Sequence, residues 1–206
     1  MKKIIAIYIA ALVIVSCAQK ETFPPVHEVL KVIESERVEP LDLSWKKPEW
    51  SAHLLGHVKG MKQLWDSATD IEEFIPGYKS MSAERQIKGI GELLVALAYY
   101  ESGFNPKSNS VDVGKPGAKD TYSVGLYQVS VVDQSWAGGG YKYSFEELST
   151  PLPNIDLAMA LMKRQLLKTQ TIALQNSSKY RYWAVLLHGN KYSKIPQIKA
   201  RILKNL

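Results

Sequence analysis

A glutamate at the end of a predicted helix is the residue of this chain best placed for acid–base chemistry. Ile90, Leu94 and Leu97 recur at helical spacing. Glu101 follows Leu94 by seven residues, which returns a side chain to within about 20° of its starting direction. Gly103 then ends the helix, so this carboxyl should lie where the apolar face opens into a loop. Apolar surroundings disfavour the charged form of a carboxyl, which is the property that a general acid needs.

Two short motifs flank a polar loop, and the first of them contains this glutamate. Their sequences are ESGFNP at 101–106 and SVGLYQ at 123–128. Together they resemble the signature of the soluble lytic transglycosylase (SLT, or goose-type-lysozyme-like) family, which reads Glu-Ser-Gly-Phe-Asn-Pro, a loop, and Gly-Leu-Met-Gln. The resemblance covers roughly residues 90–190 and includes the sequence PNI at 153–155. It departs from the family after Gln128, where many members have Met-Pro-x-Thr and this chain has VSVVD.

The resemblance implies a substrate, a reaction and a set of site residues. The substrate would be peptidoglycan, cleaved at the β-1,4 bond that follows N-acetylmuramic acid. Glu101 would be the single acid and base, and the muramic 6-hydroxyl would attack the anomeric carbon to leave a 1,6-anhydro end. The residues in positions that would contact the sugar are Ser102, Ser123, Tyr127, Gln128 and, in place of a family tyrosine, His188.

Two other functions stay open at this point. Asp112 and Asp120 lie in the loop, in the region where goose-type lysozymes place the Asp residues that activate water. A second carboxylate about 6.5–9.5 Å from Glu101 would make the enzyme an inverting hydrolase, that is, a muramidase. A non-catalytic peptidoglycan-binding lipoprotein is the third possibility, and a desolvated carboxyl in the acid position speaks against it.

The predicted fold is mainly α, an α+β lysozyme-like domain in which a small β-hairpin or loop lobe lies beside the active-site cleft. The lobe would fall at residues 111–120. The resemblance implies that residues 125–128 begin a helix that faces the glutamate. Ser82 is the expected N-cap of the long helix that ends at Glu101. We expect further helices over residues 50–68, 155–175, 180–188 and 191–206, with a polar connection at 145–153.

The N-terminal residues predict export and a lipid anchor. Lys2 and Lys3 precede an apolar run too short to span a bilayer comfortably, and IVSC at 14–17 looks like a bacterial lipobox. We therefore expect a signal peptide at 1–16, diacylated Cys17 at the start of a proline-punctuated tether at 17–49, and a catalytic domain at 50–206. Without Asp after Cys17, the expected location is the outer membrane, facing the periplasm.

Composition narrows the expected partners. Cys17 is the only cysteine, which excludes an internal disulfide. The formal net charge is +6, but export and the absence of a basic stripe interleaved with aromatics argue against nucleic acid. No cofactor is implied, and we expect a monomer. His53 and His57 have a spacing that could hold a metal, but no third ligand is apparent, so no metal site is predicted.

Overall fold

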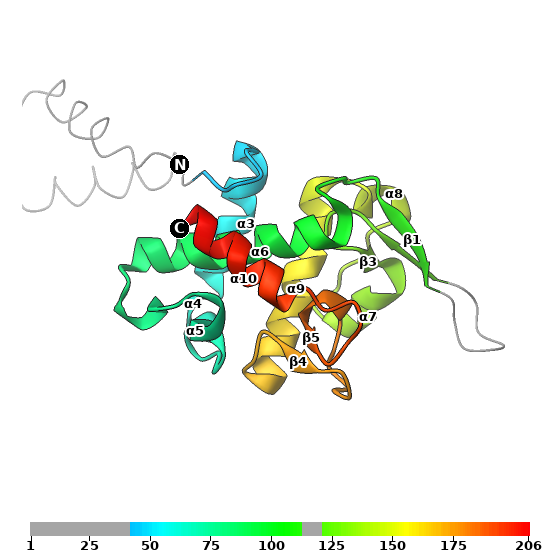
Figure 1. Cartoon of the computed structure of the whole chain (residues 1–206). Coiled ribbons are helices and arrows are strands. Elements are labelled where there is room, and N and C mark those ends of the chain that lie inside the picture. The colour runs from blue at the N-terminus through cyan, green and yellow to red at the C-terminus, as the bar shows by residue number, and fades with distance from the viewer. Residues whose placement is uncertain (1–41, 113–120) are drawn as a thin grey trace, which may run out of the picture. The chain divides into compact units, whose positions relative to one another are not determined.

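The computed structural model describes residues 42–112 and 121–206, and this part of the chain is a mainly helical, lysozyme-like domain with small sheets (Figure 1). The predicted fold class is therefore confirmed. The predicted signal peptide and Cys17 lie outside the described residues. The helices that carry the packing are α3 (Pro48–Gly60), α4 (Lys62–Asp66), α5 (Ile71–Phe74), α6 (Ala83–Ser102), α7 (Gln134–Ala137), α8 (Phe145–Leu148), α9 (Pro151–Thr169) and α10 (Ile195–Asn205).

Helix α6 forms the centre of the domain, with α3 and α10 packed against it (Figure 1). The predicted N-cap is confirmed, since the Ser82 hydroxyl accepts the backbone N–H of Arg85 at 3.3 Å. The predicted stripe is buried, but so is every residue from Gly89 to Ala98. The middle of α6 is thus enclosed on all sides rather than on one face. Gly91 permits this closeness, because a Cβ there would lie 2.9 Å from a methyl of Leu43.

The packed part of the chain begins earlier than the predicted boundary at residue 50. Leu43 and Trp45 are buried in the core, and the Trp45 indole N–H donates to the Ser51 hydroxyl at 2.8 Å. The predicted tether therefore extends too far, because apolar side chains before the helix have partners in the core. The helix predicted over 50–68 is also broken at Met61, whose φ of −111° and ψ of 12° are not helical.

A β-hairpin is present, but its strands flank the predicted range 111–120, of which residues 113–120 lie outside the described residues. Strand β1 (Asn109–Asp112) pairs antiparallel with β2 (Thr121–Val124), and β2 pairs antiparallel with the short β3 (Val129–Ser130). Residues 125–128 form the tight turn between β2 and β3, so the prediction that they begin a helix is wrong. Gly125 has a φ of +80° and Gln128 one of +49°, which are turn conformations that a right-handed helix excludes. A one-turn 3₁₀-helix, η2 (Val131–Asp133), follows instead.

Two predicted boundaries differ in the second half. Residues 145–153 are not a plain connection, because α8 begins at a capping box in which Ser144 and Glu147 bind each other's backbone N–H groups. Helix α9 begins at Pro151 rather than Ile155, since proline at the first helical position needs no hydrogen-bond donor. It ends before Gln170, whose φ is +50°, so the predicted extension to residue 175 is wrong.

The helix predicted over 180–188 is absent. Those residues contain a one-turn 3₁₀-helix, η3 (Ala184–Leu186), and strand β5 (Leu187–His188), which pairs parallel with β4 (Leu174–Gln175). A periodic apolar run of this length can be buried as a strand as well as a helix, which is why the pattern misled. The helix predicted over 191–206 is confirmed, but it is shorter: α10 spans Ile195–Asn205.

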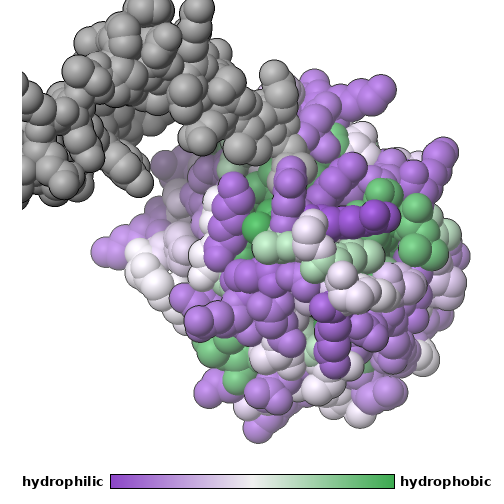
Figure 2. Space-filling view, turned by 90° about the vertical axis from the view of Figure 1, so that its left-hand side faces the viewer, coloured by the Kyte–Doolittle hydropathy of each residue, from purple (hydrophilic) through white to green (hydrophobic). Residues whose placement is uncertain are grey.

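One face of the domain is largely polar (Figure 2). Figure 2 shows this face, where hydrophilic side chains predominate and hydrophobic residues form small, separate patches. Among the described residues, none of the helices combines the length and the apolar character needed to cross a membrane.

Candidate active site

Glu101 is the next-to-last residue of α6, where the helix leaves the core. Its side chain is half-buried, between the enclosed stretch that ends at Ala98 and the exposed Gly103. Gly103 has a φ of +62° and its N–H donates to the Tyr99 carbonyl at 2.9 Å, which ends the helix as predicted. The carboxyl is therefore carried on a rigid helix end and is partly accessible.

The two sequence motifs meet through a hydrogen bond beside this glutamate. The Ser102 hydroxyl lies 2.9 Å from the Leu126 carbonyl oxygen and 3.1 Å from that of Ala98. Since a hydroxyl has one proton, it donates to one of these acceptors at a time. The contact holds the turn at 125–128 against the last turn of α6, so the closeness of the two motifs is confirmed.

Phe104, the aromatic residue of the first motif, packs against another aromatic side chain. Phe104 has a φ of +68° and contacts the Tyr99 ring, with ring centroids 5.4 Å apart. The Arg201 guanidinium of α10 lies over both rings, 4.1 Å from the Tyr99 centroid and 5.4 Å from that of Phe104. These contacts fix the chain directly after the glutamate to the C-terminal helix.

Asn154 anchors the turn from the opposite side. This residue of α9 is fully buried; its amide donates to the carbonyls of Val124 and Leu148, each at 2.8 Å, and its oxygen accepts the Tyr127 N–H at 2.9 Å. A Cβ on Gly125 would lie 2.0 Å from the Asn154 amide nitrogen, so only glycine fits there. The sequence PNI at 153–155 had matched the family motif, but that match predicted no structural role for Asn154.

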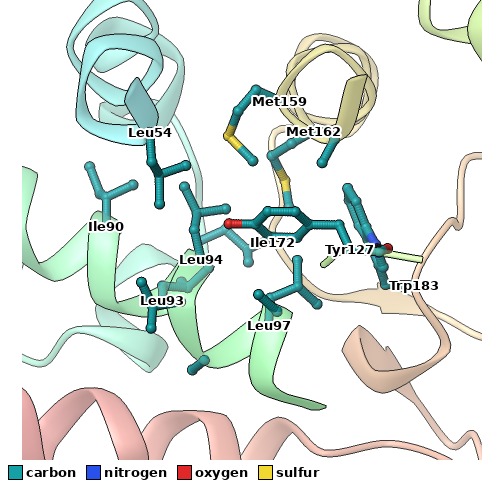
Figure 3. Packing of buried hydrophobic residues seen from close by; sticks show 14 of the residues in the cluster. Leu54, Ile90, Leu93, Leu94, Leu97, Tyr127, Met159, Met162, Ile172 and Trp183 are labelled. Carbon is teal, nitrogen blue, oxygen red and sulfur yellow. Dashed lines mark hydrogen bonds between the residues drawn. The ribbon is translucent and has the colours of Figure 1, made fainter. Parts of the chain in front are cut away.

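Tyr127 is not a sugar contact, and that prediction is wrong. Its side chain is fully buried and lies among core side chains that include Leu94, Met159 and Met162 (Figure 3). Burial raises the pKa of its phenol well above the ordinary value, and the hydroxyl has no hydrogen-bond partner within the described ranges. Its carbonyl accepts the Trp183 indole N–H at 2.9 Å. The family resemblance had implied a sugar contact for this position, but the resemblance does not determine which side of the turn the ring occupies.

Gln128 is in the turn, Ser102 ends α6 and Ser123 is on β2, and the predicted contacts of all three with sugar stay predictions. The Gln128 amide donates to the carbonyls of Gly125 at 2.9 Å and Ser108 at 3.1 Å, and its oxygen accepts the Ser110 hydroxyl at 2.9 Å. This side chain therefore also ties the turn to the β1 side of the hairpin. Ser123 is half-buried on β2 and pairs with Ser130 of β3.

His188 lies in a surface hollow at the paired strands β4 and β5. On β5 it is paired in register with Gln175, and it lines a hollow together with Asp70 and Glu73. Glu101 does not line this hollow. The predicted contact between His188 and sugar stays a prediction, although residues 180–188 are not a helix.

The predicted roles of Asp112 and Asp120 as second carboxylates stay predictions. Asp112 ends β1, opposite Thr121, and nothing of its side chain is described, while Asp120 lies outside the described residues. A different carboxylate adjoins the hairpin: Asp133 accepts the Tyr182 hydroxyl at 2.7 Å, and that hydroxyl lies 3.3 Å from the Ser130 N–H. Asp133 lies in the VSVVD segment, where the chain departs from the family motif, and the sequence predicted no role for it.

A third side chain that could bind a metal accompanies the histidine pair, where the sequence had shown none. Asp156 of α9 approaches both rings, with its Oδ1 2.7 Å from the Nε2 atoms of His53 and of His57. Because Asp156 follows His53 by more than one hundred residues, only the packing of α3 against α9 reveals the cluster.

Comparison with known proteins agrees with this geometry. The family model described as Transglycosylase SLT domain matches residues 81–187. Wild-type form 2 of Bd0314 DslA is 22% identical, with a TM-score of 0.66 over 79% of this chain and 94% of that one. Two Glu-to-Gln mutants of Bd0314 DslA give TM-scores of 0.62 and 0.64 at 24% and 23% identity; they cover 74% and 82% of this chain and 86% and 92% of theirs. No curated protein matches.

The fold is that of a lysozyme-like domain. The chain belongs to the transglycosylase SLT domain family.

Proposed function

We propose that this protein is a peptidoglycan lytic transglycosylase in which Glu101 is the only acid and base. The observation that carries the proposal is the hydrogen bond from Ser102 to the Leu126 carbonyl, which joins the glutamate-bearing helix end to the turn of the second motif. A half-buried carboxyl on a rigid helix end, beside such a turn, suits protonation of a bound glycosidic oxygen.

The reaction can proceed with one carboxyl because the substrate supplies the nucleophile. Protonated Glu101 gives its proton to the oxygen that leaves the muramic anomeric carbon, and the C1–O bond breaks through an oxocarbenium-like transition state. The resulting carboxylate then accepts the proton of the muramic 6-hydroxyl as that oxygen bonds to C1. The products are a free 4-hydroxyl and a 1,6-anhydro end, and Glu101 finishes protonated as it began.

Zymography with purified peptidoglycan tests the role of the glutamate. Wild-type protein should clear the gel, and Glu101→Gln should lose at least about 100-fold in activity, as expected for loss of a general acid. Glu84→Gln is the matched control, since Glu84 is exposed in the first turn of the same helix. Equal clearing by wild type and Glu101→Gln contradicts the assigned role, and no clearing by either favours a binding protein.

Mass spectrometry of the released muropeptides tests the reaction itself. A transglycosylase leaves muramic ends one water lighter than the reducing ends that a muramidase leaves. Reducing ends from the wild-type enzyme would contradict the proposal and would direct attention to Asp112, Asp120 and Asp133 as activators of water.

We also propose that the protein is a lipoprotein of the outer membrane, acylated at Cys17 and facing the periplasm. The support is the lipobox sequence at 14–17 and the single cysteine of the chain. Radiolabelled palmitate should be incorporated into the wild-type protein and not into Cys17→Ser. Labelling of both proteins, or recovery of the wild type in the soluble periplasmic fraction, would contradict the anchor.

A further inference from the structure

Three side chains from two helices place candidate metal ligands at one point. His53 and His57 project from α3 one turn apart, with ring centroids 5.1 Å apart, and Asp156 projects from α9. The Nε2 atom of each ring lies 2.7 Å from the same carboxylate oxygen, Oδ1. One ligand atom from each of the three residues lies within 4.8 Å of the other two.

The positions of the two helices that carry these side chains are fixed by the core beneath them. On α3, Leu54 and Val58 are fully buried, and on α9 so are Ile155 and Leu157. Each buried residue is next in sequence to a member of the cluster, so neither helix can rotate without exposing apolar surface. The two rings and the carboxylate are therefore preorganised, which lowers the entropic cost of binding a ligand.

A further hydrogen bond orients the carboxylate. Its second oxygen, Oδ2, accepts the Tyr143 hydroxyl at 2.9 Å. Outer hydrogen bonds of this kind hold a ligating carboxylate in place and direct its other oxygen to the metal. Tyr143 follows α7 and precedes α8, so a third segment of the chain supports the cluster.

The cluster is accessible from a hollow on the surface. The side chains of His53, His57 and Asp156 are 31%, 29% and 22% exposed. Both histidines line a hollow of about 770 Å³ that also includes Trp136, Tyr141 and Arg164. An ion can enter, and a solvent molecule can complete its coordination. Glu101 is not among the residues that line this hollow.

Two imidazole nitrogens and one carboxylate oxygen suit Zn²⁺, with two His and one acidic residue as the protein ligands and a fourth position open. Bond lengths of about 2.0–2.2 Å in a tetrahedral site place ligand atoms about 3.3 Å apart. Each 2.7 Å contact must therefore lengthen by about 0.6 Å, which side-chain rotation alone can provide. Magnesium and calcium prefer oxygen ligands and do not suit the two imidazoles.

We propose that His53, His57 and Asp156 form a Zn²⁺ site that links α3 to α9, with its fourth position open to the hollow. The cationic Lys163, Arg164 and Lys168 line the same hollow and favour an anionic group, such as hydroxide or a carboxylate, in that position. The site is separate from the proposed chemistry at Glu101 and does not depend on it.

Calorimetric titration of the untagged, metal-stripped full chain with ZnCl₂ tests the proposal. We expect one Zn²⁺ per chain, and at least about 100-fold weaker binding in His53→Ala, His57→Ala and Asp156→Asn. Tyr143→Phe should weaken binding about 10-fold, because it removes only the outer hydrogen bond. His188→Ala is the matched control, a partly exposed histidine outside the cluster, and should bind like the wild type.

Two further measurements keep the proposal open to refutation if a variant folds poorly. Co²⁺ added to the stripped wild type should give the visible absorption of tetrahedral coordination, and His53→Gln should not. Zn²⁺ should raise the thermal midpoint of the wild type and leave that of His53→Gln unchanged. Equal Zn²⁺ affinity in wild type and His53→Ala, or no binding by the wild type, would overturn the site and leave a hydrogen-bonded cluster without metal.

Discussion

Replacement of Asn154 by alanine should separate the glutamate-bearing helix end from the turn that faces it. The amide is fully buried and makes three hydrogen bonds, to the carbonyls of Val124 and Leu148 and from the Tyr127 N–H. No water reaches this position from outside, so each backbone group would lose its partner in the buried state. The same turn contacts Ser102, which adjoins Glu101.

The magnitude follows from the three lost partners. A buried polar group left without a partner costs about 1–3 kcal/mol, so three of them predict a loss of about 3–9 kcal/mol in the free energy of unfolding. Domains of this size have a total free energy of unfolding of about 5–15 kcal/mol. Asn154→Ala should therefore be folded but marginal. Asn154→Asp should be worse, because it turns a donor toward the carbonyls of Val124 and Leu148 into an acceptor.

Urea unfolding followed by tryptophan fluorescence measures this loss, and zymography measures its effect on activity. Asn109→Ala is the matched control, because the Asn109 side chain is exposed on β1, and it should change the free energy by less than about 0.5 kcal/mol. Activity per folded molecule should fall in Asn154→Ala, since the turn is no longer held. A loss below about 1 kcal/mol would refute the reasoning, because it would mean that the three bonds contribute no more than one ordinary bond.

Two further substitutions test buried groups in the core. Tyr127→Phe removes a hydroxyl that has no partner in the described part of the chain, so the free energy of unfolding should stay the same or rise, and activity should persist; a large loss of activity with normal stability would restore Tyr127 as a substrate contact. Glu92 is 2% exposed; burial raises its pKa, although one oxygen accepts the Ser44 N–H at 2.9 Å. The folded state then binds more protons than the unfolded state above about pH 4.5, so wild-type stability should fall relative to Glu92→Gln as the pH rises from there toward 7, and parallel urea midpoints at all pH values would contradict this.

Local signals in the sequence were sufficient for the central helix and the joined motifs. Ser82, the apolar stripe and Gly103 act within one or two turns, and the structure places all three as predicted. The mainly helical class and the hairpin followed from periodicity and from the polar, glycine-rich loop. These features depend on neighbours close in sequence, which is why they could be read without coordinates.

Features that depend on distant partners could not be predicted. The side on which Tyr127 lies is set by Asn154 and Trp183, which hold its backbone from two other segments. The short strand at Leu187 forms because a partner strand at Leu174 is available, and the apolar pattern alone does not distinguish strand from helix. The cluster at Asp156 likewise exists only once α3 and α9 are packed.

Among the motif residues, Glu101 is the one suited to acid–base chemistry, and several others hold the surrounding backbone in place. Ser102 donates to backbone carbonyls, Gln128 binds the backbone on both sides of the turn, and Tyr127 fills the core. A general acid must be held within a few tenths of an ångström of its productive position, which requires such a supporting shell. Substitutions of these supporting residues should therefore lower activity through stability and position. Only Glu101→Gln should abolish activity in a protein that unfolds at the wild-type urea concentration.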